Sequence, residues 1–313
     1  MYRLCKEMVV IALIFMSFTM TACNKEASTN KISNDDEAQA FWNDAPFGFT
    51  RCGNGYYYIG KEKTGFLKDN DDMRVIPEMV LYFDVSTQES YPVCGKAQCN
   101  HMTESCDAYL GDDYFGQSIW YYREHLYLLR WDEKKNDVIL VEFSTDCTER
   151  RDLFVIAQNR AKAGGEYGLV FHDDYVYVYD ILGRQTLKDD NHISITKMAL
   201  DGSSREEVYT KEAGSSQIGA VKSYGEQLMF TVTDRKYVDN TFQCEMSGIY
   251  AYNYESGKVT TLLEEPVYSY CIDEENQILY YFKFEDGLYK KSLNSDKTER
   301  IFECDDGSKL CQI

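Results

Sequence analysis

From about residue 48 onward, apolar and polar positions alternate in short runs, and the runs occur in pairs with a polar turn between them. Alternation with a period of two on both sides of a short turn is the signature of a β-hairpin. Five such hairpins are predicted to pair residues 48–51 with 56–59, 119–122 with 126–129, 169–171 with 175–179, 220–224 with 228–232, and 267–272 with 278–282.

A second hairpin follows each of these five. It pairs residues 80–85 with 90–93, 139–143 with 152–156, 193–200 with 206–209, 249–254 with 258–263, and 288–293 with 298–302. Each unit therefore has four antiparallel strands, and after a longer first interval the units repeat about every 50 residues. Four strands at that period predict an all-β fold, a β-propeller of four-stranded antiparallel blades.

Five blades are visible, and residues 304–313 look like the beginning of an incomplete sixth. Three arrangements remain open. The ring closes at five blades, residues 41–49 complete a sixth, or the chain is a shortened member of a longer family.

The connections between the predicted strands differ in length according to their position. In an antiparallel blade with strands A to D, the A–B and C–D turns lie on one rim, and the B–C and D–A connections lie on the other. The long connections, at residues 60–79, 94–118, 157–168, 180–192 and 233–248, all belong to the second rim. Because binding residues favour long loops on a rigid scaffold, we expect any functional surface there.

Composition narrows the possible partners. The chain has 33 Lys and Arg against 52 Asp and Glu, a net charge of −19. Phosphate backbones would be repelled, so nucleic acid is excluded as a partner. The 26 Tyr could stack on sugars, but their alternation within strands favours packing between blades.

The amino terminus has the features of an export signal. Arg3 and Lys6 precede an apolar run at 8–20, and residues 1–22 are predicted to be a signal peptide. Met20-Thr21-Ala22-Cys23 resembles a bacterial lipobox. That resemblance implies that Cys23 becomes the first mature residue and carries diacylglycerol and palmitate-type chains. An ordinary secretory signal with a chance cysteine is the alternative.

A lipid at Cys23 would anchor the mature chain to the outer face of a bacterial cell membrane, in an extracytoplasmic location. Residues 23–40 are polar and predict a flexible tether, which leaves 41–313 for the propeller, with a Cys- and His-containing insertion at 94–118.

Within that insertion, Cys94, Cys99, His101 and Cys106 form the sharpest chemical cluster. Three thiolates and an imidazole suit tetrahedral Zn²⁺. The alternatives are a disulfide, Cys94–Cys106 or Cys94–Cys99, that pins the loop, or free thiols. Of the 11 Cys, one lies in the signal and one is Cys23, so an odd number remains and at least one cannot pair within the chain.

The lipobox, the Tyr-rich hairpins and the pattern Cys94-x4-Cys99-x-His101-x4-Cys106, followed by Ala108-Tyr109, together support a family resemblance. The chain resembles the uncharacterised propeller lipoproteins of clostridial Firmicutes, whose blades are similar to the propeller of the low-density-lipoprotein receptor. The resemblance implies a fold and a location, and no activity.

Sequence signatures of hydrolases, zinc proteases, P-loop enzymes and dinucleotide-binding enzymes are absent. We therefore expect a monomeric binding module rather than an enzyme, with an unknown protein or carbohydrate ligand held by the long loops. The alternative is a glycosidase or lyase with carboxylates in the propeller funnel. Acidic pairs that could supply them are Asp112-Asp113, Asp173-Asp174 and Asp189-Asp190.

Overall fold

The computed structural model describes most of the chain after residue 47. The described residues are 48–61, 66–69, 72–75, 77–111, 113–158, 167–180, 192–212, 216–238, 241–283, 286–295 and 297–303. The predicted signal peptide, Cys23, the tether, residues 41–47 and the start of a sixth blade at 304–313 lie outside these ranges. No helix in the described ranges has the length and apolar character needed to cross a bilayer.

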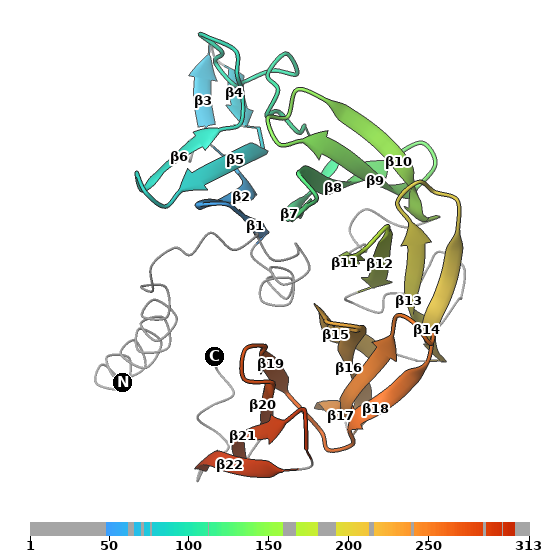
Figure 1. The fold of residues 1–313 in the computed structure, drawn as a ribbon. Helices are drawn as coiled ribbons and strands as arrows, with labels where there is room; N and C mark the ends of the chain where they lie inside the picture. The colour runs from blue at the N-terminus through green and yellow to red at the C-terminus, as the bar shows by residue number, and fades with distance from the viewer. Residues whose placement is uncertain are drawn as a thin grey trace. The chain divides into compact units, whose positions relative to one another are not determined.

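Five sheets of four antiparallel strands form the blades of a ring, as the sequence predicts (Figure 1). Blade 1 contains β1 (Phe49–Cys52), β2 (Gly55–Gly60), β5 (Met79–Asp84) and β6 (Glu89–Pro92), and blade 2 contains β7 (Tyr114–Tyr122), β8 (His125–Asp132), β9 (Asp137–Ser144) and β10 (Arg150–Ala157). Blade 3 contains β11 (Tyr167–His172), β12 (Tyr175–Asp180), β13 (His192–Ala199) and β14 (Arg205–Glu212). Blade 4 contains β15 (Ser216–Tyr224), β16 (Gln227–Val238), β17 (Thr241–Asn253) and β18 (Val259–Leu263), and blade 5 contains β19 (Ser269–Asp273), β20 (Ile278–Lys283), β21 (Gly287–Ser292) and β22 (Thr298–Glu303).

Within every blade the strands pair in chain order, and β1, β7, β11, β15 and β19 are the inner strands (Figure 1). Strictly antiparallel pairing places all A–B and C–D turns on one rim, which we call the short-turn rim. The B–C and D–A connections lie on the other, which we call the long-connection rim.

Two connections on the long-connection rim differ from the sequence prediction. Residues 60–79 hold an additional hairpin, β3 (Phe66–Asp69) with β4 (Asp72–Val75). Residues 233–248, predicted to be a loop, instead extend β16 and β17 to 12 and 13 residues. Their antiparallel pairing continues from Thr233↔Met246 to Val238↔Thr241.

The core lies between blades, where aromatic side chains from neighbouring sheets meet. Phe171 of blade 3 is fully buried, and its ring centroid lies 5.1 Å from that of Tyr122 and 4.6 Å from that of Tyr127, both in blade 2. Tyr177 lies 5.3 Å from Tyr254 of blade 4. The predicted packing role of these tyrosines is confirmed at these contacts.

At Gly248 the backbone of β17 lies close to the backbone of β18. A Cβ atom at this position would overlap the backbone carbonyl of Leu263, which cannot rotate away as a side chain can. We expect Gly248→Ala to lower the free energy of unfolding by about 1–3 kcal/mol, the usual cost of overpacking. Gly219→Ala is the control, because its Cβ would meet only Thr231 Oγ1 at 3.7 Å. Equal urea midpoints for the two variants would contradict the expectation.

Candidate metal centre

Residues 93–110, which we call the Cys loop, leave blade 1 after β6 and return to the same blade. The return is fixed by β5, since Val80 N donates to Ala108 O at 2.9 Å and Leu110 N donates to Glu78 O at 3.1 Å. Met79 and Leu81 of β5 form a buried apolar cluster with Cys106 and Ala108. The loop therefore stands on a rigid strand, and Cys106 is its buried contact point.

The structure brings the four predicted ligands together. The ligand atoms of Cys94, Cys99, His101 and Cys106 all lie within 4.8 Å of one another, and His101 Nδ1 is 3.3 Å from Cys106 Sγ. None of these three cysteines is in a disulfide, and the same holds for Cys52, Cys147 and Cys271 among the described residues. This group could hold a metal ion.

The backbone of the Cys loop turns the four side chains inward. Gln98 and His101 both have φ near +60°, at 62° and 56°. Such left-handed conformations are uncommon outside glycine and cost energy that the surrounding structure has to offset. They lie next to Cys99 and at the imidazole ligand, where the chain has to reverse direction.

Backbone hydrogen bonds lower the pKa of the thiols in this loop, whereas burial raises it. Burial opposes ionisation of Cys94, yet hydrogen bonds from the backbone of Lys96 and Asp107 outweigh it and lower the pKa of this thiol. Burial raises the pKa of Cys106 to about 12, although the Ala108 backbone donates to it. Cys94 and Cys106 thus each interact with the amide two residues further along the chain.

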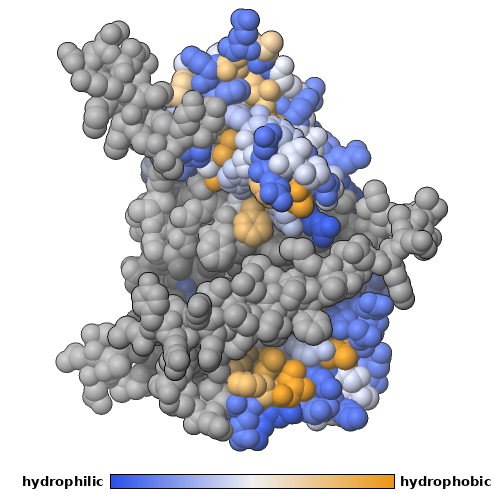
Figure 2. Space-filling view, turned by 90° about the vertical axis from the view of Figure 1, so that its left-hand side faces the viewer, coloured by the Kyte–Doolittle hydropathy of each residue, from blue (hydrophilic) through white to orange (hydrophobic). Residues whose placement is uncertain are grey.

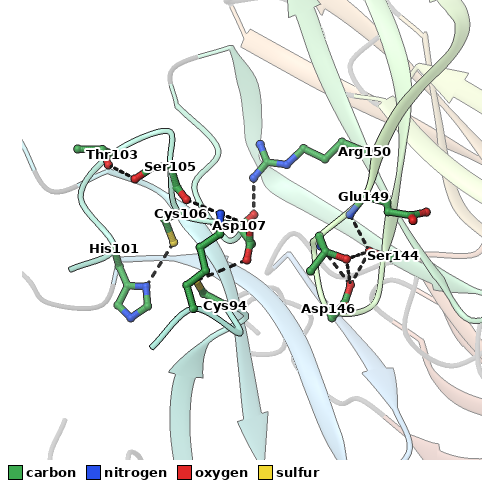
Figure 3. A network of polar contacts seen from close by, with 12 residues as sticks. Cys94, His101, Thr103, Ser105, Cys106, Asp107, Ser144, Asp146, Glu149 and Arg150 are labelled. Atoms are coloured by element: carbon green, nitrogen blue, oxygen red, sulfur yellow. Dashed lines mark hydrogen bonds and ion pairs between the residues drawn. The ribbon is translucent and has the colours of Figure 1, made fainter. Parts of the chain in front are cut away.

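Figure 3 shows Asp107 beside Cys94, with Arg150 reaching Asp107 from blade 2. Lys96 Nζ lies 2.6 Å from Asp107 Oδ1 and donates to Ser105 O, also at 2.6 Å. Arg150 of β10 donates to the backbone oxygen of Asp107, so the loop is held by blade 2 as well as blade 1. The Lys96–Asp107 ion pair and the Arg150 hydrogen bond thus hold the part of the loop that follows Cys106.

The spacing of the four ligand atoms can be compared with that of a structural zinc site. With Zn–S bonds near 2.3 Å, tetrahedral geometry places sulfur ligands about 3.8 Å apart. The observed limit of 4.8 Å is within a small side-chain adjustment of that spacing. Four protein ligands leave no open position, so such an ion would stabilise the loop rather than activate water.

The acidic pair Asp173-Asp174, a candidate for catalysis in the sequence, lies on the short-turn rim. Arg123 of blade 2 pairs with both residues, with Nη1 2.5 Å from Asp174 Oδ1 and Nη2 3.9 Å from Asp173 Oδ1. These carboxylates are exposed and link two blades. Asp112 and Asp189-Asp190 lie outside the described residues.

Sequence reasoning missed three residues that support the candidate metal centre: Lys96, Asp107 and Arg150. Asp107 follows Cys106 directly, and an acidic residue beside a cluster of ligands was a signal that could have been used. Arg150 had no such signal, because it reaches the Cys loop from another blade.

No protein-family model and no curated protein matches this chain. Among solved structures, it is similar to an oligogalacturonate lyase in complex with manganese, with a TM-score of 0.50 and 14% identity over 83% of this chain and 64% of that one. It is also similar to prolyl endopeptidases, with a TM-score of 0.45 and 14% identity over 79% of this chain and 33% of the other. A chain of the nidogen/laminin complex matches with a TM-score of 0.42 and 13% identity over 80% of this chain and 76% of that one.

The chain thus spans just under two thirds of the length of the lyase that it matches. At this level of identity, the likeness shows the propeller fold alone. The resemblance to clostridial lipoproteins stays a prediction.

Proposed function

We propose that the protein is a lipid-anchored, extracytoplasmic β-propeller that binds a protein or carbohydrate through its long-connection rim. The observation that carries the proposal is the difference between the two rims. The long-connection rim holds the β3–β4 hairpin, the Cys loop and the extended β16–β17 strands. Lipidation of Cys23 and export rest on the sequence pattern described above.

The short-turn rim has the opposite character, because its turns are closed by their own side chains. Asp84 Oδ1 accepts from Ser86 N at 2.7 Å, Asp201 Oδ1 from Ser203 N at 2.8 Å, and Asp273 Oδ1 from Asn276 N at 3.1 Å. Such capped turns satisfy their polar groups locally and offer little to a ligand. Elaboration on one rim only is typical of scaffolds that bind there.

Zinc is the metal that we propose for Cys94, Cys99, His101 and Cys106. Manganese, which the oligogalacturonate lyase carries in its complex, prefers oxygen-rich sites, whereas thiolate and imidazole ligands suit zinc. In this role the ion would fix the conformation of the Cys loop on the long-connection rim.

The negative charge of this chain disfavours oligogalacturonate as a substrate. It is a polyanion, and this chain has a net charge of −19, so the long-range electrostatic term opposes their encounter. The described carboxylates of Asp173-Asp174 are already paired with Arg123. These observations favour a binding module over the lyase alternative.

The proposal is tested with two matched variants of the mature chain. One replaces residues 62–77, which include β3 and β4, by a short Gly-Ser link, and the other replaces the short turn at residues 85–88. Cross-linking on intact cells, read by quantitative mass spectrometry, should enrich the same partner with the parent and the turn variant and lose it with the hairpin variant. Equal enrichment with the hairpin variant, or turnover of oligogalacturonates by the parent, would contradict the proposal.

A further inference from the structure

The Cys loop is held in place mainly by polar contacts. Apart from Val93 and Leu110 at its two ends, its buried residues are Cys106 and Ala108, which pack on β5, whereas residues 95–98 and 103–105 are exposed. The described surface of the molecule is likewise mostly hydrophilic on the side that Figure 2 shows, with apolar residues in small groups. Burial therefore fixes one part of the loop, and the position of the other ligands depends on hydrogen bonds and ion pairs.

Two consecutive carbonyl groups directly after the ligand Cys106 are held by different blades. The Ala108 carbonyl accepts from Val80 N of β5, in blade 1, at 2.9 Å. The Asp107 carbonyl accepts from the guanidinium of Arg150, in blade 2. The backbone that follows Cys106 is thus fixed between the two blades, and Arg150 supplies the contact from blade 2.

The side chain of Asp107 connects this point to the other end of the loop. Its Oδ2 accepts from Cys94 Sγ at 3.8 Å, and its Oδ1 lies 2.6 Å from Lys96 Nζ. The Asp107 side chain is only 13% exposed. Asp107 therefore follows the last of the four ligands, Cys106, along the chain and contacts the first, Cys94, through its carboxylate. A residue that holds Asp107 also holds the spacing of these two ligands.

Arg150 is the last residue of the turn at 144–150, which joins β9 to β10 and which we call the blade 2 turn. The turn is closed from within, because Asp146 Oδ1 accepts from Ser144 Oγ at 2.6 Å. It is also bound to blade 1 at a second point, where Tyr57 OH donates to Thr145 O at 3.1 Å. The blade 2 turn is therefore a rigid support from which Arg150 reaches the Cys loop.

We propose that Arg150 is a positioning residue of the metal centre. From blade 2 it holds the Asp107 carbonyl, and thereby keeps Cys106 and Cys94 in place for the ion. The inference rests on the zinc that is proposed above for the Cys loop. Coupling between two sites is reciprocal, so bound zinc would in turn hold the blade 2 turn against blade 1. The ion would then link two blades as well as stabilise its own loop.

Arg150→Met tests the positioning role, because it removes the hydrogen-bond donors and keeps an unbranched side chain over the Phe143 ring, whose centroid now lies 5.0 Å from the guanidinium. The zinc affinity of the mature chain, measured by competition with a chromophoric chelator, should fall about tenfold. This is the lower end of the usual 10–100-fold effect of outer contacts at metal sites, since Arg150 is exposed. Arg150→Lys, which restores a donor, should recover most of the affinity.

Arg151→Met is the matched control. Arg151 is the adjacent exposed arginine, and its Nη2 lies 2.8 Å from Glu142 Oε1 within blade 2. Its replacement removes the same charge from the same strand and leaves the Asp107 contact in place, so the zinc affinity should not change. An equal loss of affinity in Arg151→Met and Arg150→Met would overturn the proposal, because net charge alone would then explain the effect.

Hydrogen–deuterium exchange provides a readout that a general loss of stability would not reproduce. In the parent, zinc should slow exchange of amides in the blade 2 turn by up to about tenfold. In Arg150→Met, zinc should still slow exchange in the Cys loop but no longer in this turn, and β11 and β12 of blade 3 should be unaffected in both proteins.

The parent measurement alone can decide against the proposal, even if Arg150→Met fails to fold. Zinc that binds the parent and slows exchange in the Cys loop without slowing it in the blade 2 turn would overturn the positioning role and leave the zinc site standing. Equal zinc affinities of the parent and Arg150→Met would do the same. A parent that binds no zinc would instead refute the zinc site itself, and this inference with it.

Discussion

Replacing Cys99 by Ser is expected to reduce the zinc content of the mature protein from stoichiometric to near zero. The remaining ligands, Cys94, His101 and Cys106, would form an incomplete set around an ion that structural sites bind with four protein ligands. Zinc in small structural sites contributes about 10–16 kcal/mol of apparent binding free energy at neutral pH. Elemental analysis and native mass spectrometry of protein purified under reducing conditions measure this directly.

The effect should be local, because the Cys loop stands on blades that pack through their own apolar clusters. Limited proteolysis should cut residues 93–110 much faster in Cys99→Ser, or after chelation, with the blades left intact. Cys52→Ser is the control, since Cys52 is also a partly buried cysteine outside any disulfide and lies outside the group. Purified parent protein without metal, and with an intact mass that shows a disulfide between Cys94 and Cys99 or Cys106, would contradict the zinc proposal.

Phe171→Ala is expected to lower the free energy of unfolding by about 3–5 kcal/mol. The ring is fully buried between blades 2 and 3, and its removal would leave a cavity lined by Tyr122 and Tyr127. Rigid strands on both sides prevent the sheets from collapsing into that space, so both the transfer and the cavity contributions are lost. Urea unfolding followed by far-ultraviolet circular dichroism would measure the change.

Tyr91→Ala is the comparison, because it removes a ring that is 47% exposed. Its cost should stay near ±0.5 kcal/mol, as for most surface substitutions. Similar losses in the two variants would mean that the contacts of Phe171 with blade 2 are not what stabilises this boundary.

The blades could be predicted from sequence because their hairpins carry apolar runs on both sides of short polar turns. Alternation was not needed in every strand, since β11 and the middle of β8 and β9 are buried without interruption. The β3–β4 hairpin was missed because its short strands are largely polar around the turn at residues 69–72. The outer parts of β16 and β17 were missed for a related reason. Backbone pairing continues through them, and backbone hydrogen bonds leave no pattern in the sequence of side chains.

The four ligands of the candidate metal centre could be predicted because they are close in sequence, and a short loop brings nearby residues together. The contact of Arg150 with the Asp107 carbonyl could not, since it depends on how blade 2 packs against blade 1. The hydrogen bond from Tyr57 OH to Thr145 O, between residues 88 positions apart, is of the same kind. Patterns that are local in the sequence predict the strands of a blade, whereas contacts between blades depend on how the blades pack.

The start of β1 determines the rim at which the amino-terminal segment joins the propeller. An inner strand starts on the rim of the D–A connections, so Phe49 enters the propeller at the rim that carries the Cys loop. If Cys23 is lipidated, a flexible segment as long as residues 24–40 has a root-mean-square span of roughly 20–25 Å. The rim that carries the Cys loop would then be tethered within reach of the bilayer. A ligand held in the same membrane would meet that rim at a raised effective concentration, whereas a soluble ligand would not.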